Sequence, residues 1–290
     1  MFKGVMTAVI TPFVDGRIDE SALRKLIDWQ IAEGIDAIVP CGTTGEAATL
    51  SYEEQDRAVR VAVEQAAGRV PVIAGAGSNS TSNAIKLARQ VKAAGADAML
   101  QVTPFYNKPT QEGLHQHFRA IAEVVDLPMV LYNVPGRTAV NILPETVARL
   151  AKIDSIVGVK EASGRIEQIR EVLRLTPDGF AVLSGDDGLN FEVYRAGGAG
   201  AISVVSNVAP KLVSAVWDAF DAGRADEASQ MQRDLDLLNK AMFIETNPIP
   251  AKTSLAMMGR CAEEFRLPMT PISEEHRAEL KDILVKYGIL

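Results

Sequence analysis

The sequence predicts an α/β fold: a (β/α)₈ barrel followed by a C-terminal helical extension. Eight short, β-rich apolar runs alternate with amphipathic helical stretches over the first two-thirds of the chain. After Asn207 the strand-like runs stop and only helical patterns follow. We therefore predict one barrel domain over residues 1–222, carrying the active site, and a helical extension over residues 223–290 that packs on the barrel.

The predicted strands are separated by segments long enough for one helix each, as parallel strands require. Helical spacing is clear at Glu53–Ala67, Asn83–Ala94 and Glu112–Val125. A doubly wound open sheet is the alternative, but the segment GAGSNS at residues 75–80 lacks the third glycine of a dinucleotide fingerprint. The strands are expected at residues 5–13, 37–42, 71–77, 98–104, 128–135, 156–163, 180–187 and 200–207.

The segment after the eighth strand has helical patterns without intervening strands. We expect its first helix, Lys211–Ala222, to complete the barrel. The other three helices would form the extension, packed on the barrel or between subunits. They are predicted at Ala225–Thr246, Pro250–Met258 and Ser273–Tyr287.

The composition excludes several classes of partner. The chain has 290 residues and a net charge of −7, and it has no dense basic block that would bind nucleic acid or an anionic membrane. No apolar run is long enough to span a membrane, and the first residues form a predicted strand rather than a signal peptide. Only two cysteines are present, which fits a reducing cytoplasm, so we expect a cytoplasmic protein.

The histidines do not predict a metal site, and we expect neither a metal nor a cofactor. His115 and His117 are two residues apart on a predicted helix, so they point in different directions. Asp186 and Asp187 have no further ligand beside them and are expected to cap the next helix. Cys41 has no histidine to activate it, and we take it as a packing residue. The segment GGAGA at residues 197–201 precedes the eighth strand, on the face opposite the strand ends, and is expected to be structural.

Lys160 stands at the end of the apolar run IVGVKEASG, residues 156–164. Side chains alternate along a strand, so Lys160 lies on the face opposite Val157 and Val159 and points into the barrel mouth. Chemistry in such barrels takes place at the C-terminal ends of the strands. A partly desolvated amine there stays partly neutral and can form a Schiff base with a carbonyl substrate. A salt bridge to a neighbouring carboxylate is the alternative.

Two tyrosines follow neighbouring strands. Tyr132 can point into the same mouth, where a phenol beside a neutral amine would shuttle the protons of imine formation. Its alternative is a buried tyrosine whose hydroxyl bonds to the backbone. Tyr106 lies in the loop after the fourth strand and could extend this proton relay.

Two segments could bind carboxylates. Thr43 and Thr44, in GTTGE at residues 42–46, offer hydroxyls and backbone N–H groups in a concave turn, although a threonine capping the next helix is the alternative. Arg137, in VPGRT, can hold a second carboxylate through two hydrogen bonds, or else form a surface salt bridge.

These motifs together resemble the dihydrodipicolinate synthase family, within the pyruvate-dependent class I aldolases. The resemblance covers nearly the whole chain, and several long motifs in order are more specific than any single one. The motifs are TPF, GTTGE, TPFYNKPTQEGL, LYNVPGRT, GVKEASG, LSGDD, GAISVVSN, NPIPAK and FRLPMTPI.

The resemblance implies a role for each candidate residue. Lys160 would form the imine with pyruvate, and Tyr132, Thr43 and Tyr106 would form the proton relay, with Tyr106 reaching into a neighbouring subunit. Thr43 and Thr44 would hold the pyruvate carboxylate. Arg137 would receive the carboxylate of L-aspartate 4-semialdehyde, and the backbone at Gly185 and Ile202 would line the pocket.

The resemblance also implies lysine and diaminopimelate biosynthesis, and a homotetramer built as a dimer of dimers. In lysine-inhibited members a glutamate, a tyrosine and histidines hold the inhibitor at a subunit interface. Here the matching positions carry Asn83, Phe105, Tyr52 and Gln55. The carboxylate for the lysine ammonium is missing, so we expect weak or absent inhibition by lysine.

Two other functions share part of this pattern. N-acetylneuraminate lyase, or a 2-keto-3-deoxy sugar-acid aldolase of the same superfamily, would share Lys160, Tyr132 and the threonine turn. Arg137 favours a short aldehyde with a carboxylate over a polyhydroxylated sugar. A non-catalytic barrel that binds a keto acid is the second alternative, and the presence of Lys160, Tyr132, Thr43 and Tyr106 together argues against it.

Overall fold

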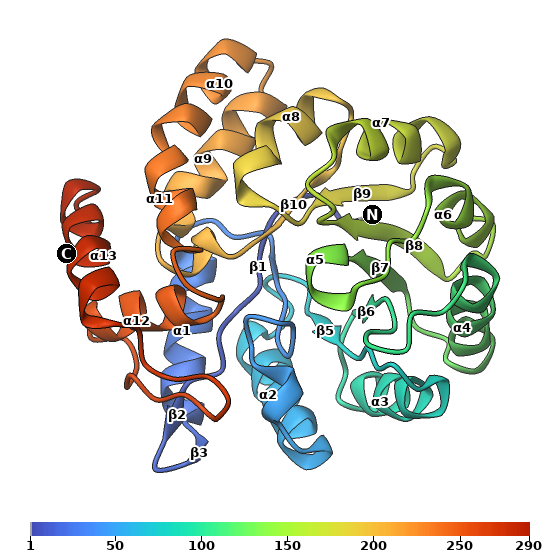
Figure 1. Cartoon of the computed structure of the whole chain (residues 1–290), viewed down its shortest axis with the longest axis horizontal. Helices are drawn as coiled ribbons and strands as arrows, with labels where there is room; N and C mark the ends of the chain where they lie inside the picture. The colour runs from blue at the N-terminus through green and yellow to red at the C-terminus, as the bar shows by residue number, and fades with distance from the viewer. Residues whose placement is uncertain (1) are drawn as a thin grey trace.

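The computed structural model describes residues 2–290 and confirms the (β/α)₈ barrel. Its eight-stranded sheet is parallel throughout, and an isolated parallel bridge between Ile38 and Val72 joins the two outermost strands (Figure 1). In spatial order the strands are β4 (Ala37–Ile38), β1 (Gly4–Thr7), β10 (Gly200–Ser203), β9 (Ala181–Ser184), β8 (Ile156–Glu161), β7 (Met129–Asn133), β6 (Ala98–Val102) and β5 (Ile73–Gly75).

All eight predicted strands are present, but each is shorter than the apolar run that predicted it. The prediction over residues 37–42 was wrong beyond Ile38, because the chain turns at Cys41, whose φ is +55°. The prediction over residues 5–13 was wrong beyond Thr7. Its last residue belongs instead to a small antiparallel hairpin of β2 (Phe13–Val14) and β3 (Arg17–Ile18).

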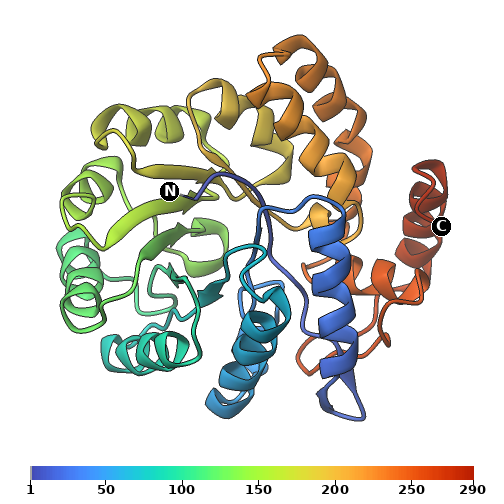
Figure 2. The same ribbon diagram turned by 180° about the vertical axis from the view of Figure 1, so that it is seen from behind.

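Helices surround the strands on the outside of the barrel, as both views show (Figures 1 and 2). Met6, Leu100 and Leu183 belong to a small apolar cluster inside the barrel, whereas a larger cluster fills the layer between strands and helices. The helices are α1 (Glu20–Ala32), α2 (Tyr52–Ala66), α3 (Thr81–Ala93), α4 (Gln111–Val124), α5 (Pro135–Thr138), α6 (Pro144–Leu150), α7 (Ile166–Leu175), α8 (Asn190–Arg195) and α9 (Pro210–Asp221).

The C-terminal extension lies outside this ring and reaches back to the barrel mouth (Figure 1). It consists of α10 (Ala225–Asp234), α11 (Asp236–Ala241), α12 (Ile249–Met257) and α13 (Glu274–Lys286). The single helix predicted over residues 225–246 was therefore wrong. The helix is interrupted at Leu235 and ends at Ala241. No helix in residues 2–290 combines the length and apolar character needed to cross a bilayer.

Candidate active site

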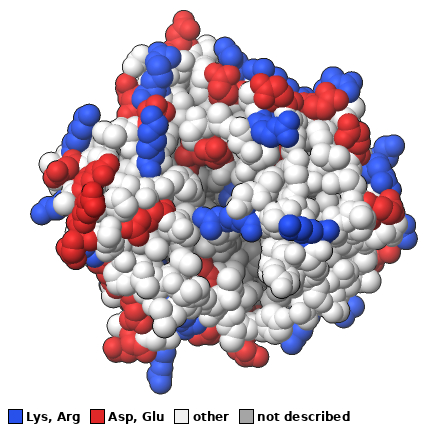
Figure 3. Space-filling view, in the orientation of Figure 1, with Lys and Arg blue, Asp and Glu red and all other residues white. Residues whose placement is uncertain are grey.

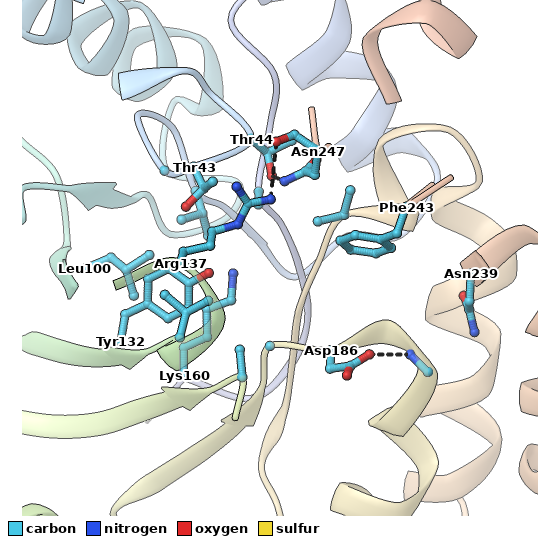
Figure 4. Close-up of a pocket in the computed structure, with 18 of the residues that line it drawn as sticks. Thr43, Thr44, Leu100, Tyr132, Arg137, Lys160, Asp186, Asn239, Phe243 and Asn247 are labelled. Atoms are coloured by element: carbon cyan, nitrogen blue, oxygen red, sulfur yellow. Dashed lines mark hydrogen bonds between the residues drawn. The ribbon is translucent and has the colours of Figure 1, made fainter. Parts of the chain in front are cut away.

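A cavity of about 390 Å³ opens at the C-terminal ends of the strands. Thr43 and Thr44 line it from the turn after β4, Tyr132 from β7, Arg137 from α5 and Lys160 from β8 (Figure 4). The space-filling view shows a hollow at the centre of this face, with Lys and Arg atoms beside it and charges of both signs around it (Figure 3). Gly185, after β9, also lines it, so the structure brings together six of the eight site residues that the sequence analysis named.

The Lys160 side chain is buried without an anionic partner. The residue is 5% exposed, and within residues 2–290 its amine makes no salt bridge and no hydrogen bond. Its nearest aromatic neighbour is Tyr132, whose ring centre lies 4.5 Å from Lys160 Nζ, because the two residues pair across β7 and β8. The alternative of a salt bridge at Lys160 is wrong, and the amine is left available to a ligand.

The residues next to Lys160 shape its surroundings. Gly185, after β9, leaves room for the lysine chain, since a Cβ there would lie 3.0 Å from Lys160 Cε. Glu161 lies on the opposite face, where its carboxylate accepts hydrogen bonds from Asn133 Nδ2 at 3.0 Å and the Ser163 amide at 2.8 Å. Burial raises the pKa of Glu161, and these hydrogen bonds oppose that shift. The one carboxylate adjacent in sequence is thus held away from the amine.

Thr44 and Arg137 are connected through the C-terminal extension. Asn247 Nδ2 donates to Thr44 Oγ1 at 3.1 Å, and Arg137 Nη2 donates to the Asn247 carbonyl at 3.3 Å (Figure 4). The Arg137 guanidinium forms no salt bridge with any described residue, so the surface salt bridge proposed as its alternative is wrong. Helix capping by a threonine is also wrong, because Ser51 caps α2.

The extension also lines the cavity itself, which the sequence analysis did not predict. Asn239 and Lys240 of α11 are lining residues, as are Phe243 and Asn247 from the segment before α12. The motif NPIPAK was noted only as part of the resemblance. Its prolines did signal a turn, but a turn alone does not reveal what it faces.

A buried ion pair lies behind the threonine turn. Glu46, two residues after Thr44, pairs with Lys252 of α12, and both side chains are almost fully buried. Lys252 Nζ also donates to the Glu264 carbonyl at 3.0 Å. Burial lowers the pKa of Lys252, and the charge of Glu46 opposes that shift. This pair joins the turn that carries Thr43 and Thr44 to the extension.

The chain matches known proteins over nearly its whole length. A model of the Dihydrodipicolinate synthetase family matches residues 1–287. The chain belongs to this family. The 4-hydroxy-tetrahydrodipicolinate synthase of Pelobacter propionicus is 53% identical over 290 residues, all of both chains. A solved structure of a chloride-inhibited dihydrodipicolinate synthase from Acinetobacter baumannii, complexed with pyruvate, is 44% identical, covers 100% of both chains and has a TM-score of 0.98. A structure described as the first monomeric dihydrodipicolinate synthase variant is 45% identical, covers 100% of this chain and 98% of its own, and also has a TM-score of 0.98.

Two residues suggested by the resemblance to the dihydrodipicolinate synthase family lie away from the cavity. Tyr106 is 88% exposed, takes a left-handed backbone conformation with φ of +75°, and is not among the residues lining the cavity. Ile202 is buried inside the barrel below it. A second cavity, of about 540 Å³, shares Thr43, Tyr132 and Arg137 with the first and includes Phe105, but not Tyr106, in its lining.

Three other side chains noted in the sequence, Cys41, Asp186 and Asp187, make local contacts. Burial raises the pKa of the Cys41 thiol to about 12, which fits a packing residue. Asp186 caps a short 3₁₀ turn, accepting from the Gly188 amide at 3.1 Å, as predicted. Asp187 does not cap that helix; it accepts from the amides of Val204 and Val205 after β10. Among residues 2–290, no group of His, Cys, Asp and Glu side chains is placed to hold a metal ion.

Proposed function

We propose that this chain condenses pyruvate with L-aspartate 4-semialdehyde, the reaction of a 4-hydroxy-tetrahydrodipicolinate synthase. The observation that carries the proposal is the buried Lys160 amine, without a carboxylate partner, in a cavity that also holds Thr44 and Arg137. The names of the curated relatives support the same reaction.

The first half of the reaction forms an enamine. Neutral Lys160 Nζ attacks C2 of pyruvate, and the carbinolamine loses water to give the imine. Tyr132, next to the amine, and the Thr43 hydroxyl transfer the proton that the departing hydroxyl needs. The Thr44 hydroxyl and the backbone N–H groups of its turn hold the pyruvate carboxylate. Loss of a proton from C3 then gives the nucleophilic enamine.

The second half forms the carbon–carbon bond and closes the ring. The enamine carbon attacks the aldehyde carbon, which becomes a hydroxyl-bearing carbon. Arg137 holds the carboxylate of the semialdehyde. The amine of the adduct then attacks C2 and displaces Lys160, which is released as the free amine. The balance is one pyruvate and one semialdehyde consumed, and one cyclic product and one water formed.

The test compares aldehydes in the presence of pyruvate. We expect pyruvate consumption with L-aspartate 4-semialdehyde and none with sugar aldehydes, together with reductive trapping of pyruvate on Lys160 by borohydride. Turnover with the sugars alone would assign the chain to the sugar-acid aldolases and refute the role of Arg137. Absence of both trapping and turnover would support a binding protein instead.

Assembly is part of the proposal. We infer a homo-oligomer, a tetramer built as a dimer of dimers, in which Tyr106 enters the site of a neighbouring copy. The 88% exposure of Tyr106 and its absence from the lining of its own cavity support this. Mixing two inactive variants, Lys160→Met and Tyr106→Phe, should restore part of the activity if the residues act across subunits. No restoration after dissociation and reassembly would argue for a site within one chain. The cytoplasmic location stays a prediction. The division of the chain into a barrel domain, residues 1–222, and a helical extension, residues 223–290, also stays a prediction.

Weak inhibition by lysine also stays a prediction. Tyr52 and Gln55 line the second cavity, and the Lys86 ammonium lies 4.4 Å from the Tyr52 ring centre. The face of the Tyr52 ring is therefore already in contact with a cation, and Asn83 offers no negative charge to the ammonium of a bound lysine. We expect full activity in millimolar lysine, and strong inhibition at sub-millimolar lysine would contradict the prediction.

A further inference from the structure

The strand that carries Lys160 contains an irregularity. Where β8 pairs with β7, Met129 stands opposite Ile156, but the next residue, Val130, stands opposite Gly158. Val157 is therefore an extra residue of β8 without a partner on β7, which makes a β-bulge. Such a bulge changes which face of the sheet the following side chains take, and bulges beside active sites often re-aim a side chain in this way.

This bulge decides which face Lys160 takes. Val157 packs against the apolar cluster inside the barrel, whereas Val159 belongs to the outer cluster, so the expectation that both valines share the outer face was wrong for Val157. From Val159 onward the alternation is regular: Lys160 enters the cavity and Glu161 faces the helices. Without the extra residue, the alternation that begins at Val157 would place Lys160 in the outer layer.

A buried hydrogen-bond network joins β7 and β8 just after the bulge. Asn133 stands opposite Glu161, and its Nδ2 donates to both carboxylate oxygens, at 3.0 and 3.1 Å. The same carboxylate accepts from the Ser163 amide at 2.8 Å and from Gln168 Nε2 of α7 at 3.2 Å. Glu161 is 1% exposed, and no Lys, Arg or His in residues 2–290 forms an ion pair with it. A carboxylate buried without a cation depends on such N–H groups, because each one lost leaves its desolvation uncompensated.

The network and the bulge select the same pairing of the two strands. In the pairing without the bulge, Asn133 would stand opposite Lys160, and the Glu161 carboxylate would lose its partner on β7. We propose that Asn133 and Glu161 are positioning residues whose hydrogen bonds hold the bulged pairing. This pairing keeps the Lys160 amine beside the ring of Tyr132, 4.5 Å from its centre (Figure 4). The inference rests on the Schiff-base step of the proposed function and adds two residues that touch neither substrate.

The experiment exchanges donor and acceptor between the two positions. Glu161→Gln removes one acceptor oxygen, and Asn133→Asp places two carboxylates against each other. In each single variant we expect kcat, and the rate of borohydride trapping at saturating pyruvate, to fall about 10- to 100-fold, the scale of a misplaced reacting group. The KM for pyruvate should stay within about twofold, because the threonine turn is unaltered. The double variant has an amide at position 161 facing a carboxylate at position 133, so it should recover most of the lost rate.

Gln30→Met is the matched control, in a buried network away from β7 and β8. Gln30 of α1 is also 1% exposed, accepts from Thr7 Oγ1 at 2.6 Å and donates to the Ser206 carbonyl at 2.9 Å. We expect its loss to lower the free energy of unfolding without changing kcat or the trapping rate. An equal fall in rate in Gln30→Met would show a general effect of destabilisation and refute the inference.

The other outcomes separate this inference from the proposed function. A double variant as slow as the single ones, or a KM for pyruvate that rises as much as kcat falls, would refute the inference and leave the proposed function standing. If the single variants do not fold, Gln168→Met removes one donor to Glu161 and should slow trapping several-fold, and an unchanged rate would refute the inference. A wild-type protein that traps pyruvate without turning over the semialdehyde would refute the proposed function alone. A wild-type protein that traps no pyruvate would refute both.

Discussion

Two buried lysines lie in two regions at the same end of the barrel, and their surroundings differ. At the contact between the threonine turn and α12, the Lys252 ammonium has the Glu46 carboxylate, the Glu264 carbonyl and the ring of Phe13, whose centre lies 4.2 Å away. At the cavity, Lys160 has only the face of Tyr132. Both residues are at most 5% exposed. Burial alone therefore does not distinguish a structural lysine from a reactive one.

Burial has a different consequence for the lysine in each region. A buried ammonium is stable only with a partner, so Lys252 and Glu46 are bound to each other and neither is available to a ligand. An amine that must attack a carbonyl needs a free electron pair, and a carboxylate beside it would hold the proton in place. The isolation of Lys160 is thus the feature that fits it for Schiff-base chemistry.

The same substitution at each lysine should give opposite results, and the larger effect concerns activity. Lys160→Met keeps the length of the side chain but removes the amine, so we expect condensation to fall at least about 10⁴-fold, the scale of removing a covalent nucleophile. The free energy of unfolding should be unchanged or higher, because no ionic partner is lost. Residual activity of a few per cent, or a strongly destabilised protein, would contradict the distinction.

Lys252→Met should act on stability instead. It leaves Glu46 buried and unpaired, so we expect a loss of about 3–5 kcal/mol in the free energy of unfolding, measured by urea denaturation. The double variant Lys252→Met with Glu46→Leu should recover much of this loss, since an apolar pair replaces the ion pair. A double variant no more stable than the single one would show that the pair is not the cause.

His117 adds a third buried basic side chain to the comparison. Among the described residues it has no carboxylate partner, and it does not line the cavity. Burial lowers its pKa to about 4, so the folded state keeps the ring neutral where the unfolded chain binds a proton. Stability should therefore fall as the pH drops from about 6.5 to 4, by up to about 3 kcal/mol from this group. In His117→Asn the fall should be smaller by that amount. Parallel pH curves for the two proteins would refute the prediction.

Asn247→Ala should have the smallest effect and test how the extension supports the cavity. It removes the hydrogen bond to Thr44 but keeps the backbone carbonyl that accepts from Arg137. We expect the KM for pyruvate to rise several-fold, about 1 kcal/mol, with the KM for the semialdehyde less affected. The reverse order of effects would place Asn247 on the second substrate rather than on the threonine turn.

The sequence was sufficient for the barrel and for most of the cavity, for a physical reason. Strand periodicity decides which face Lys160 takes, and the ends of parallel strands meet at one edge, so Thr43, Tyr132 and Lys160 had to converge. Contacts made by the extension follow no such periodicity. Asn247 reaches Thr44 across 203 positions of the chain, and no local pattern around either residue indicates that distance.

The buried pair of Glu46 and Lys252 also bears on the order in which the protein is synthesised. Translation delivers the barrel strands first and α12 near the end, and folding generally begins with the part of the chain that has emerged. In a ribosome-bound chain from which only the barrel has emerged, Lys160 and Tyr132 would be in place. Glu46 would still lack Lys252, and Asn247 would not yet have emerged. The threonine turn would then lack its support from α12. The finished pocket therefore depends on residues that leave the ribosome after the whole barrel.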